Sequence, residues 1–361
     1  VCQHCRAEAQ HRAAPGQLTN AEGHELIDQL TSYERPYPML VLTGGDCFER
    51  PDLVDLIEYA VGKGLHVSIS PSVTPLFTRE RVKAVQDAGV SVMSMSLDGG
   101  SAETHDAFRG FPGTFDRTIE ACHMLNELGM RFQLNTVFTA KNIHEAPQML
   151  KNAIDLGAFM FYTFMLVPTG RGQHLDMLTP HEREDVLHWL HDNSTRIAIK
   201  TTEAPQYRRI AFQREAVRQG KAAPAKHGEL YHWLTKETHE LLGENIEEPR
   251  PPRTPLAINS GSGFAFIDHT GDVYPSGFLP IHCGSIKDTP FPQIYRESEV
   301  FRALRNPSGF EGKCGACEFN HFCGGSRSTA YAMTGNYLAS DPSCAHIPAG
   351  YTGELPEGIE R

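Results

Sequence analysis

Two groups of cysteines at opposite ends of the 361-residue chain carry its strongest chemical signal. In the first group, Cys2 and Cys5 are separated by two residues, in the order Cys-Gln-His-Cys. The second group lies near the other end and consists of Cys314, Cys317, Cys323 and Cys344. Thiolates at such short spacings bind soft metals, either as a zinc ion or as an iron–sulfur cluster. The remaining sequence must indicate which metal is bound and what it does.

Composition narrows the class of protein. The chain has nine cysteines, and an odd number cannot all pair in disulfides. Pairs of the C-x2-C type in a large chain are typical of metal ligands in a reducing compartment, so we expect a cytoplasmic protein. A net charge of −11 disfavours nucleic acid or an anionic membrane as the main partner. No apolar run approaches the roughly 18 residues that span a bilayer, and we expect no membrane association.

Short apolar runs alternate with amphipathic stretches through the first half of the chain. The runs predict strands at residues 39–43, 65–70, 91–97, 131–138 and 159–166. The stretches predict helices at residues 51–62, 78–87, 115–128 and 143–156, after an earlier helix over residues 20–30. Repeated strand–helix units give a parallel sheet, either open or curled into a barrel. In such folds the functional residues follow the carboxyl ends of the strands.

The second half of the chain changes in character. Helical patterns cover residues 180–192 and the polar stretch 207–242, and a proline-rich linker is expected at residues 247–255. A β-hairpin with strands near residues 263–267 and 273–274 precedes the second cysteine group. We therefore expect three parts: a barrel-like unit at residues 1–200, a helical bridge at residues 201–257 and a small cysteine-rich unit at residues 258–361.

Small or polar residues recur at the predicted strand ends. They are Gly44, Gly45, Asp46, Ser70, Ser96, Asp98, Asn135, Val167 and Thr169. Paired glycines leave the backbone open to a ligand, and the carboxylate of Asp46 suits an ammonium group, although a glycine pair is also common in plain turns. Ser96 and Asp98 would point the same way and could bond a sugar hydroxyl, or Asp98 could simply end the strand in a turn. No dinucleotide or Walker A glycine motif is present, which disfavours classical nucleotide sites.

The spacing of Cys2 and Cys5 resembles the last two cysteines of the C-x3-C-x2-C loop of radical S-adenosylmethionine (radical SAM) enzymes. In that family three thiolates hold a [4Fe–4S] cluster, and its open iron chelates the amine and carboxylate of SAM. The leading cysteine would precede Val1, so we expect that cysteine and the first barrel strand to lie outside this sequence. The resemblance covers residues 1–200 and implies a partial (β/α)6 TIM-like barrel.

The same resemblance implies roles for the strand ends. The Gly44-Gly45-Asp46 run is similar to the family's GGE motif, which bonds the SAM amino group. Ser96 and Asp98 fall on the family's ribose-contacting strand, and Val167 and Thr169 fall on the loop beside the adenine. Ser70 and Asn135 are expected to complete the cofactor site.

The tail resembles the auxiliary-cluster domain called SPASM, or twitch in its shortened form. The resemblance implies a small α+β domain in which Cys314, Cys317, Cys323 and Cys344 hold one auxiliary [4Fe–4S] cluster. Ser326 stands where related tails often carry another cysteine, which leaves ligands for one cluster. Together with the Arg-Ala-Glu-Ala run at residues 6–9, the tail is most similar to radical SAM enzymes of haem and haem d1 biosynthesis, which act on propionate or acetate side chains of tetrapyrroles.

The predicted activity is reductive cleavage of SAM to a 5′-deoxyadenosyl radical that abstracts hydrogen from a tetrapyrrole side chain. An external donor such as flavodoxin or ferredoxin would supply the electron. Four arginines could hold substrate carboxylates, or could instead be surface charges or form local salt bridges: Arg171, Arg208, Arg209 and Arg327. One alternative is a radical SAM maturase that modifies a peptide. Another is a non-catalytic scaffold whose tail binds zinc.

Overall fold

The computed structural model describes residues 2–6, 13–246, 249–251 and 255–360. The linker predicted at residues 247–255 is described only in part, and residues 7–9 of the Arg-Ala-Glu-Ala run lie outside the described residues. Within the described residues, none of the helices has the length and hydrophobicity that crossing a membrane requires.

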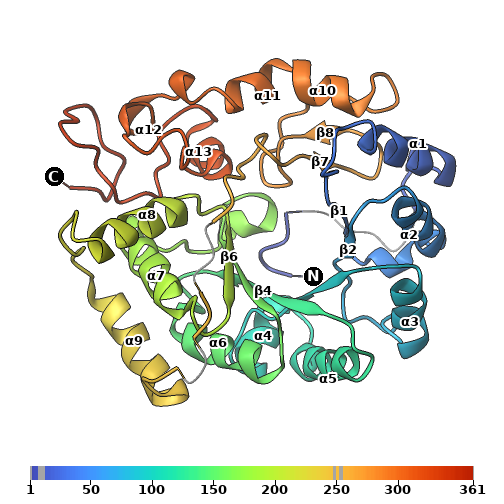
Figure 1. Cartoon of the computed structure of the whole chain (residues 1–361), viewed down its shortest axis with the longest axis horizontal. Coiled ribbons are helices and arrows are strands. Elements are labelled where there is room, and N and C mark those ends of the chain that lie inside the picture. The colour runs from blue at the N-terminus through green and yellow to red at the C-terminus, as the bar shows by residue number, and fades with distance from the viewer. Residues whose placement is uncertain (1, 7–12, 247–248, 252–254, 361) are drawn as a thin grey trace.

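A curved parallel sheet of six strands forms the centre of the molecule (Figure 1). The strands pair in chain order and are β1 (Leu40–Leu42), β2 (Val67–Ile69), β3 (Val92–Ser96), β4 (Phe132–Phe138), β5 (Met160–Met165) and β6 (Ala198–Thr202). The first five confirm the predicted strands. Each strand is followed by at least one helix, so the sheet is the α/β fold that the repeated pattern predicted.

Helices cover the outer face of this sheet (Figure 1). They are α1 (Asn20–Leu30), α2 (Leu53–Gly62), α3 (Arg79–Asp87), α4 (Ala102–Arg109), α5 (Thr114–Glu127), α6 (Ala146–Asp155), α7 (Pro180–Asn193), α8 (Gln206–Arg218) and α9 (Glu229–Leu242). The stretch predicted as helical at residues 207–242 is interrupted between α8 and α9. Gly220, with φ +69°, ends the first helix, and Pro224 lacks the N–H that would continue it.

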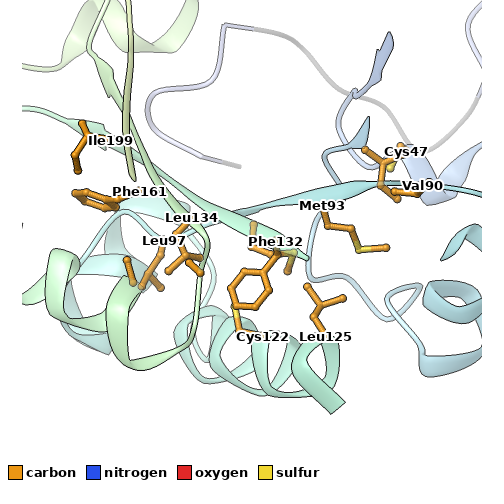
Figure 2. Packing of buried hydrophobic residues seen from close by; sticks show 14 of the residues in the cluster. Cys47, Val90, Met93, Leu97, Cys122, Leu125, Phe132, Leu134, Phe161 and Ile199 are labelled. Atoms are coloured by element: carbon orange, nitrogen blue, oxygen red, sulfur yellow. The ribbon is translucent and has the colours of Figure 1, made fainter. Parts of the chain in front are cut away.

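Side chains alternate between the two faces of the sheet. Leu134, Phe161 and Ile199 point to the helices and join the buried core shown in Figure 2. Their neighbours Asn135, Tyr162 and Lys200 lie opposite one another in the register of β4, β5 and β6 and are only half-buried. Because successive residues of a strand face opposite sides, this second row lines the concave face. The concave face is therefore polar.

Two cysteines outside the metal-binding spacings belong to the core. Cys47 and Cys122 are both buried, and Figure 2 shows them among apolar side chains. Burial raises the pKa of each thiol to about 12, so both stay protonated at neutral pH. Both side chains therefore serve as packing residues of the core.

The C-terminal region, residues 255–360, packs along one edge of the barrel (Figure 1). It contains a hairpin of β7 (Phe266–Ile267) and β8 (Val273–Tyr274), followed by α10 (Phe291–Glu297), α11 (Glu299–Leu304), α12 (Gly312–Ala316) and α13 (Arg327–Thr334). Glu203, directly after β6, accepts hydrogen bonds from Ser326 at 2.6 Å and Ser328 at 3.0 Å. The buried carboxylate therefore joins this region to the carboxyl end of the sheet.

Candidate functional site

The N-terminal thiol loop, residues 2–6, lies within the curve of the sheet (Figure 1). The Cys5 N–H donates to the Cys2 carbonyl at 3.3 Å, which closes a turn between the two cysteines. Two barrel segments hold this turn. The Gln3 N–H donates to the carbonyl of Phe108 in α4 at 3.1 Å, and the Arg171 N–H donates to the Cys5 carbonyl at 3.1 Å. Since α4 follows β3 and the short η3 helix (Gly170–His174) follows β5, the loop sits at the carboxyl ends of the strands, as predicted.

A buried ion pair stands beside Cys2. Arg109 contacts the Cys2 thiol at 3.7 Å through Nη1 and the Asp98 carboxylate at 2.5 Å through Nη2. Asp98 has no exposed surface, and its other oxygen accepts the Val137 N–H at 2.8 Å. Burial alone would raise the pKa of Asp98, but the Arg109 charge outweighs it and the pKa lies below its ordinary value. Asp98 thus holds a cation next to the thiol.

A neutral histidine completes this side of the thiol loop. His4 stacks on Phe108, with ring centroids 4.8 Å apart. Burial lowers the pKa of His4 to about 4, so its ring is uncharged at neutral pH. It therefore packs as an uncharged aromatic ring beside the thiols.

The glycine motif after β1 is tied to the loop after β2. The Asp46 carboxylate accepts the N–H of Phe48 at 3.1 Å, the N–H of Ser72 at 3.3 Å and the hydroxyl of Thr74 at 2.5 Å. The Ser72 hydroxyl donates to the Gly45 carbonyl at 2.6 Å. Among the described residues, a Cβ atom added at Gly44 would meet no protein atom within 4 Å. This part of the chain therefore leaves space beside Gly44 for a ligand.

The other predicted cofactor contacts lie on or after the strands as expected. Ser96 and Asn135 are half-buried partners across β3 and β4, and Ser70 bonds the end of β1. Val167 is buried and Thr169 is half-buried, and both lie in the loop after β5, whose residue Arg171 bonds the Cys5 carbonyl. Their contacts to a cofactor stay predictions. The direct contact predicted for Asp98 also stays a prediction, and in this structure its carboxylate is enclosed by Arg109 and Val137.

The second thiol group forms one pocket. Its four cysteines line the pocket together with Arg209, Lys313 and His346. Burial raises the pKa of Cys323 to about 12 and of Cys344 to about 11. Burying thiols in this way is costly for their charged forms, and a bound metal would restore the thiolates. The donor set therefore fits a soft metal or an iron–sulfur cluster.

Hydrogen bonds and cations already surround these sulfurs. Cys314 accepts the Asp341 N–H at 3.2 Å and the Arg327 guanidinium at 3.5 Å. Cys317 accepts the Phe319 N–H at 3.4 Å. Donors aimed at sulfur stabilise thiolates and metal-bound thiolates alike, so the pocket is electrostatically prepared for its ligand.

Sulfur spacing bears on which metal fits. Within the described residues, no three of these four thiols have their sulfur atoms within 4.8 Å of one another. Four thiolates around one zinc ion lie about 3.8 Å apart, because each Zn–S bond is about 2.3 Å. A tighter group does exist beside the pocket, where ligand atoms of Cys317, Glu318 and His346 lie within 4.8 Å of one another.

The structure gives each of the four candidate arginines a partner inside the protein. Arg171 donates to the Cys2 carbonyl at 2.9 Å, and Arg208 to the Cys323 carbonyl at 3.1 Å. Arg209 pairs with Glu184 at 2.6 Å, and Arg327 donates to the Ala339 carbonyl at 2.8 Å. Of the four, Arg209 forms a local salt bridge, as one of the predicted alternatives had it, and the other three bond backbone carbonyls.

Sequence reasoning missed two cations at the thiol sites. Arg109 lies on α4, a helix that was not predicted, and Lys313 donates to the Cys344 carbonyl. A signal for α4 was present, because Ser101 caps its first turn and Gly110 ends it with φ +74°.

Comparisons with known proteins agree with this geometry. The family model described as the radical SAM superfamily matches residues 1–153. The "AdoMet-dependent heme synthase" of Oleidesulfovibrio alaskensis is 39% identical over 352 residues, covering 96% of this chain and 84% of that protein. The protein of the same name from Methanosarcina barkeri is 38% identical, covering 96% and 93%. The structure of Streptococcus suis SuiB bound to S-adenosylmethionine superposes with a TM-score of 0.65 at 12% identity, covering 96% and 74%.

Proposed function

The chain belongs to the radical SAM superfamily, and on that premise we propose that it cleaves SAM and uses the resulting radical to take hydrogen from a tetrapyrrole side chain. The observation that carries this proposal is the pairing of two separate thiol sites in one chain, one at the strand ends and one in the C-terminal region. Similarity to haem synthases over nearly the whole chain supports the tetrapyrrole as substrate.

Cys2 and Cys5 would hold the SAM cluster together with a third thiol from outside these residues. When bound, this cluster supplies the electron that cleaves SAM to the 5′-deoxyadenosyl radical. Gly44 and Gly45 would let the SAM amino group approach the backbone, and the open space at Gly44 supports that role. Asp46 would fix this loop through its three hydrogen bonds.

Other strand ends would complete the SAM site. Ser70, Ser96 and Asn135 would bond polar atoms of SAM from the concave face, and Val167 and Thr169 would flank the adenine. Asp98 would act through Arg109, which it orients toward the Cys2 thiol.

Cys314, Cys317, Cys323 and Cys344 would hold one auxiliary [4Fe–4S] cluster, which would accept an electron from the substrate. Four thiolate ligands match the ligand number of such a cluster. In this proposal residues 258–361 form a SPASM or twitch domain, residues 1–200 the radical SAM barrel and residues 201–257 the bridge. Thiols that serve as metal ligands are typical of the cytoplasm, where flavodoxin or ferredoxin could donate electrons.

The concave face offers one cation to an acidic substrate. The Lys200 ammonium lies 4.5 Å from the centre of the Tyr162 ring, and Lys200 makes no ion pair within the described part of the chain. The hydroxyls of Tyr162 and Thr202 share a hydrogen bond nearby. A half-buried ammonium beside hydroxyl groups suits a carboxylate, so Lys200 would bind a propionate of the tetrapyrrole.

The test uses a longer version of the chain that carries the preceding cysteine. After anaerobic reconstitution with iron and sulfide, it is incubated with SAM, dithionite and an iron tetrapyrrole that bears propionates. We expect 5′-deoxyadenosine and a tetrapyrrole product of lower mass. A colourless protein that contains zinc and lacks sulfide would contradict both the activity and the cluster assignment.

A reconstituted enzyme that forms 5′-deoxyadenosine but leaves the tetrapyrrole unchanged would contradict the substrate alone. A peptide would then replace the tetrapyrrole as the substrate class to be tested. Cys5→Ala is the matched negative control, because it removes one cluster ligand and should abolish 5′-deoxyadenosine formation.

A further inference from the structure

Arg6, the residue after Cys5, reaches out of the thiol loop to the C-terminal region. Its guanidinium carbon lies 4.2 Å from the centre of the Phe266 ring and 5.8 Å from that of Phe278. Phe266 is in β7, and Phe278 follows β8. A planar guanidinium stacks well on aromatic faces, so this contact joins two segments that are far apart in the sequence.

Gly277 lies against the same guanidinium group. A Cβ atom added at Gly277 would lie 2.6 Å from the Arg6 guanidinium carbon and 2.7 Å from its Nε. The guanidinium therefore rests directly against the backbone between the two aromatic rings. Burial lowers the pKa of Arg6, with Cys5 opposing the shift, as expected for a cation that has left water. We call Phe266, Gly277 and Phe278 the arginine slot.

The backbone on the other side of Arg6 is held just as closely. Gly170 has φ +55°, and a Cβ added there would lie 2.7 Å from the Arg6 Cα and 2.9 Å from the Cys5 carbonyl oxygen. The next residue, Arg171, donates its N–H to that carbonyl. The Cys5–Arg6 segment is thus clamped between the loop after β5 and the arginine slot.

We propose that Arg6 is a positioning residue through which the C-terminal region fixes the loop that carries Cys5. The hairpin β7–β8 is then part of the mounting of the SAM cluster, in addition to any role of the auxiliary cluster. The identity of the cluster in this inference rests on the proposed function. The positioning of the Cys5 loop rests on the contacts of the arginine slot. It predicts that a change in the C-terminal region alters the SAM cluster while the auxiliary cluster stays intact.

The experiment compares Arg6→Lys, Arg6→Gln and Gly277→Ala in the longer, reconstituted chain. Lysine keeps the charge but loses the planar stack, and alanine places a methyl group in the slot from the other side. The readout is the paramagnetic resonance spectrum of the reduced clusters with and without SAM, together with iron content. We expect the SAM-responsive signal of each variant to be roughly 3- to 30-fold weaker than that of the unsubstituted chain. This range corresponds to the free energy of a stacked cation–aromatic contact. The auxiliary signal should be unchanged.

A double variant tests whether both residues act through one contact. Arg6→Gln combined with Gly277→Ala should lose no more signal than the stronger single variant, because the contact can be lost only once. The proposal would be overturned if the loss in the double variant equalled the product of the two single losses. It would also be overturned if the single variants kept a full SAM-responsive signal. Arg131→Lys is the matched control, since Arg131 stacks on Phe159 at 4.5 Å and should leave the spectrum unchanged.

A second readout keeps this inference separate from the proposed function. Hydrogen exchange of the Cys5 and Arg6 amides is measured in the iron-free chain, where no cluster is needed. Gly277→Ala should accelerate exchange at both amides, and unchanged exchange would overturn the mounting role. If the unsubstituted enzyme shows no SAM-responsive signal while the exchange result holds, the proposed function fails and the mounting stands.

Discussion

The buried pair of Asp98 and Arg109 allows a quantitative prediction. The two side chains meet at 2.5 Å, and the Asp98 and Arg109 side chains are 1% and 18% exposed. At an effective dielectric constant of 20, unit charges at this separation attract by about 6.6 kcal/mol. Removing one partner leaves the other charge buried and unpaired, which costs about 3–5 kcal/mol in proteins. We therefore expect Asp98→Asn to lower the free energy of unfolding by about 3–5 kcal/mol.

The Asn side chain makes this a selective change. Its carbonyl oxygen can still accept the Val137 N–H, but its amide group would face the N–H donors of Arg109. Unfolding in urea, followed for the iron-free chain under reducing conditions, measures the loss. With an m-value of about 3 kcal/mol per molar, the midpoint should fall by roughly 1–1.7 M.

Two further variants make the reasoning refutable. Asp98→Leu combined with Arg109→Met removes both charges and should recover most of the loss, because no charge stays unpaired. Asp87→Asn breaks the exposed Lys83–Asp87 pair and should cost under about 0.5 kcal/mol. A midpoint shift below about 0.3 M for Asp98→Asn would show that Arg109 does not need this carboxylate, and the buried-pair account would be wrong.

Three other predictions follow from the sites. Cys323→Ala should remove about four iron ions per chain and the auxiliary signal while SAM cleavage without substrate persists, as iron and sulfide analysis would measure. Lys200→Gln should weaken binding of the iron tetrapyrrole roughly 10-fold, seen in a visible-absorbance titration, with SAM cleavage unchanged without substrate. Burial lowers the pKa of His105 and His191 to about 4, against about 6.5 when unfolded. The unfolded chain therefore binds more protons between these values. As pH drops from 6.5 to 4, the free energy of unfolding should fall by up to about 1.4 kcal/mol per pH unit for each histidine, and the urea midpoint should fall with it. A rise in the midpoint would contradict the assignment.

Local patterns predicted most of the barrel. Buried parallel strands read as short apolar runs, and the five predicted runs contain β1 to β5. The thiol groups could be recognised because ligand spacing within a loop is a local property. The helical pattern of residues 207–242 contains α8 and α9 but did not locate the break between them, which falls at Gly220 and Pro224.

Long-range pairs could not be predicted in this way. Nothing in the sequence near Asp98 says that its carboxylate will face Arg109, or that Arg6 will stack on Phe266. Such contacts depend on how the loops after different strands converge, and strand periodicity carries no information on loop conformation. The direct ligand contact predicted for Asp98 stays a prediction, and strand periodicity could not show that its carboxylate is buried.

Both thiol sites use cations in one recurrent way. Arg171 bonds the carbonyl of Cys2, Arg208 that of Cys323, and Lys313 that of Cys344. A cation bonded to the backbone of a cysteine fixes the loop and places positive charge beside the sulfur at the same time. Thiolate clusters are anionic, and this chain has a net charge of −11, so local cations are needed to offset repulsion. Because these three cations are held by carbonyl oxygens, they would keep their full charge for a bound cluster, whereas Arg109 and Arg209 share theirs with the carboxylates of Asp98 and Glu184.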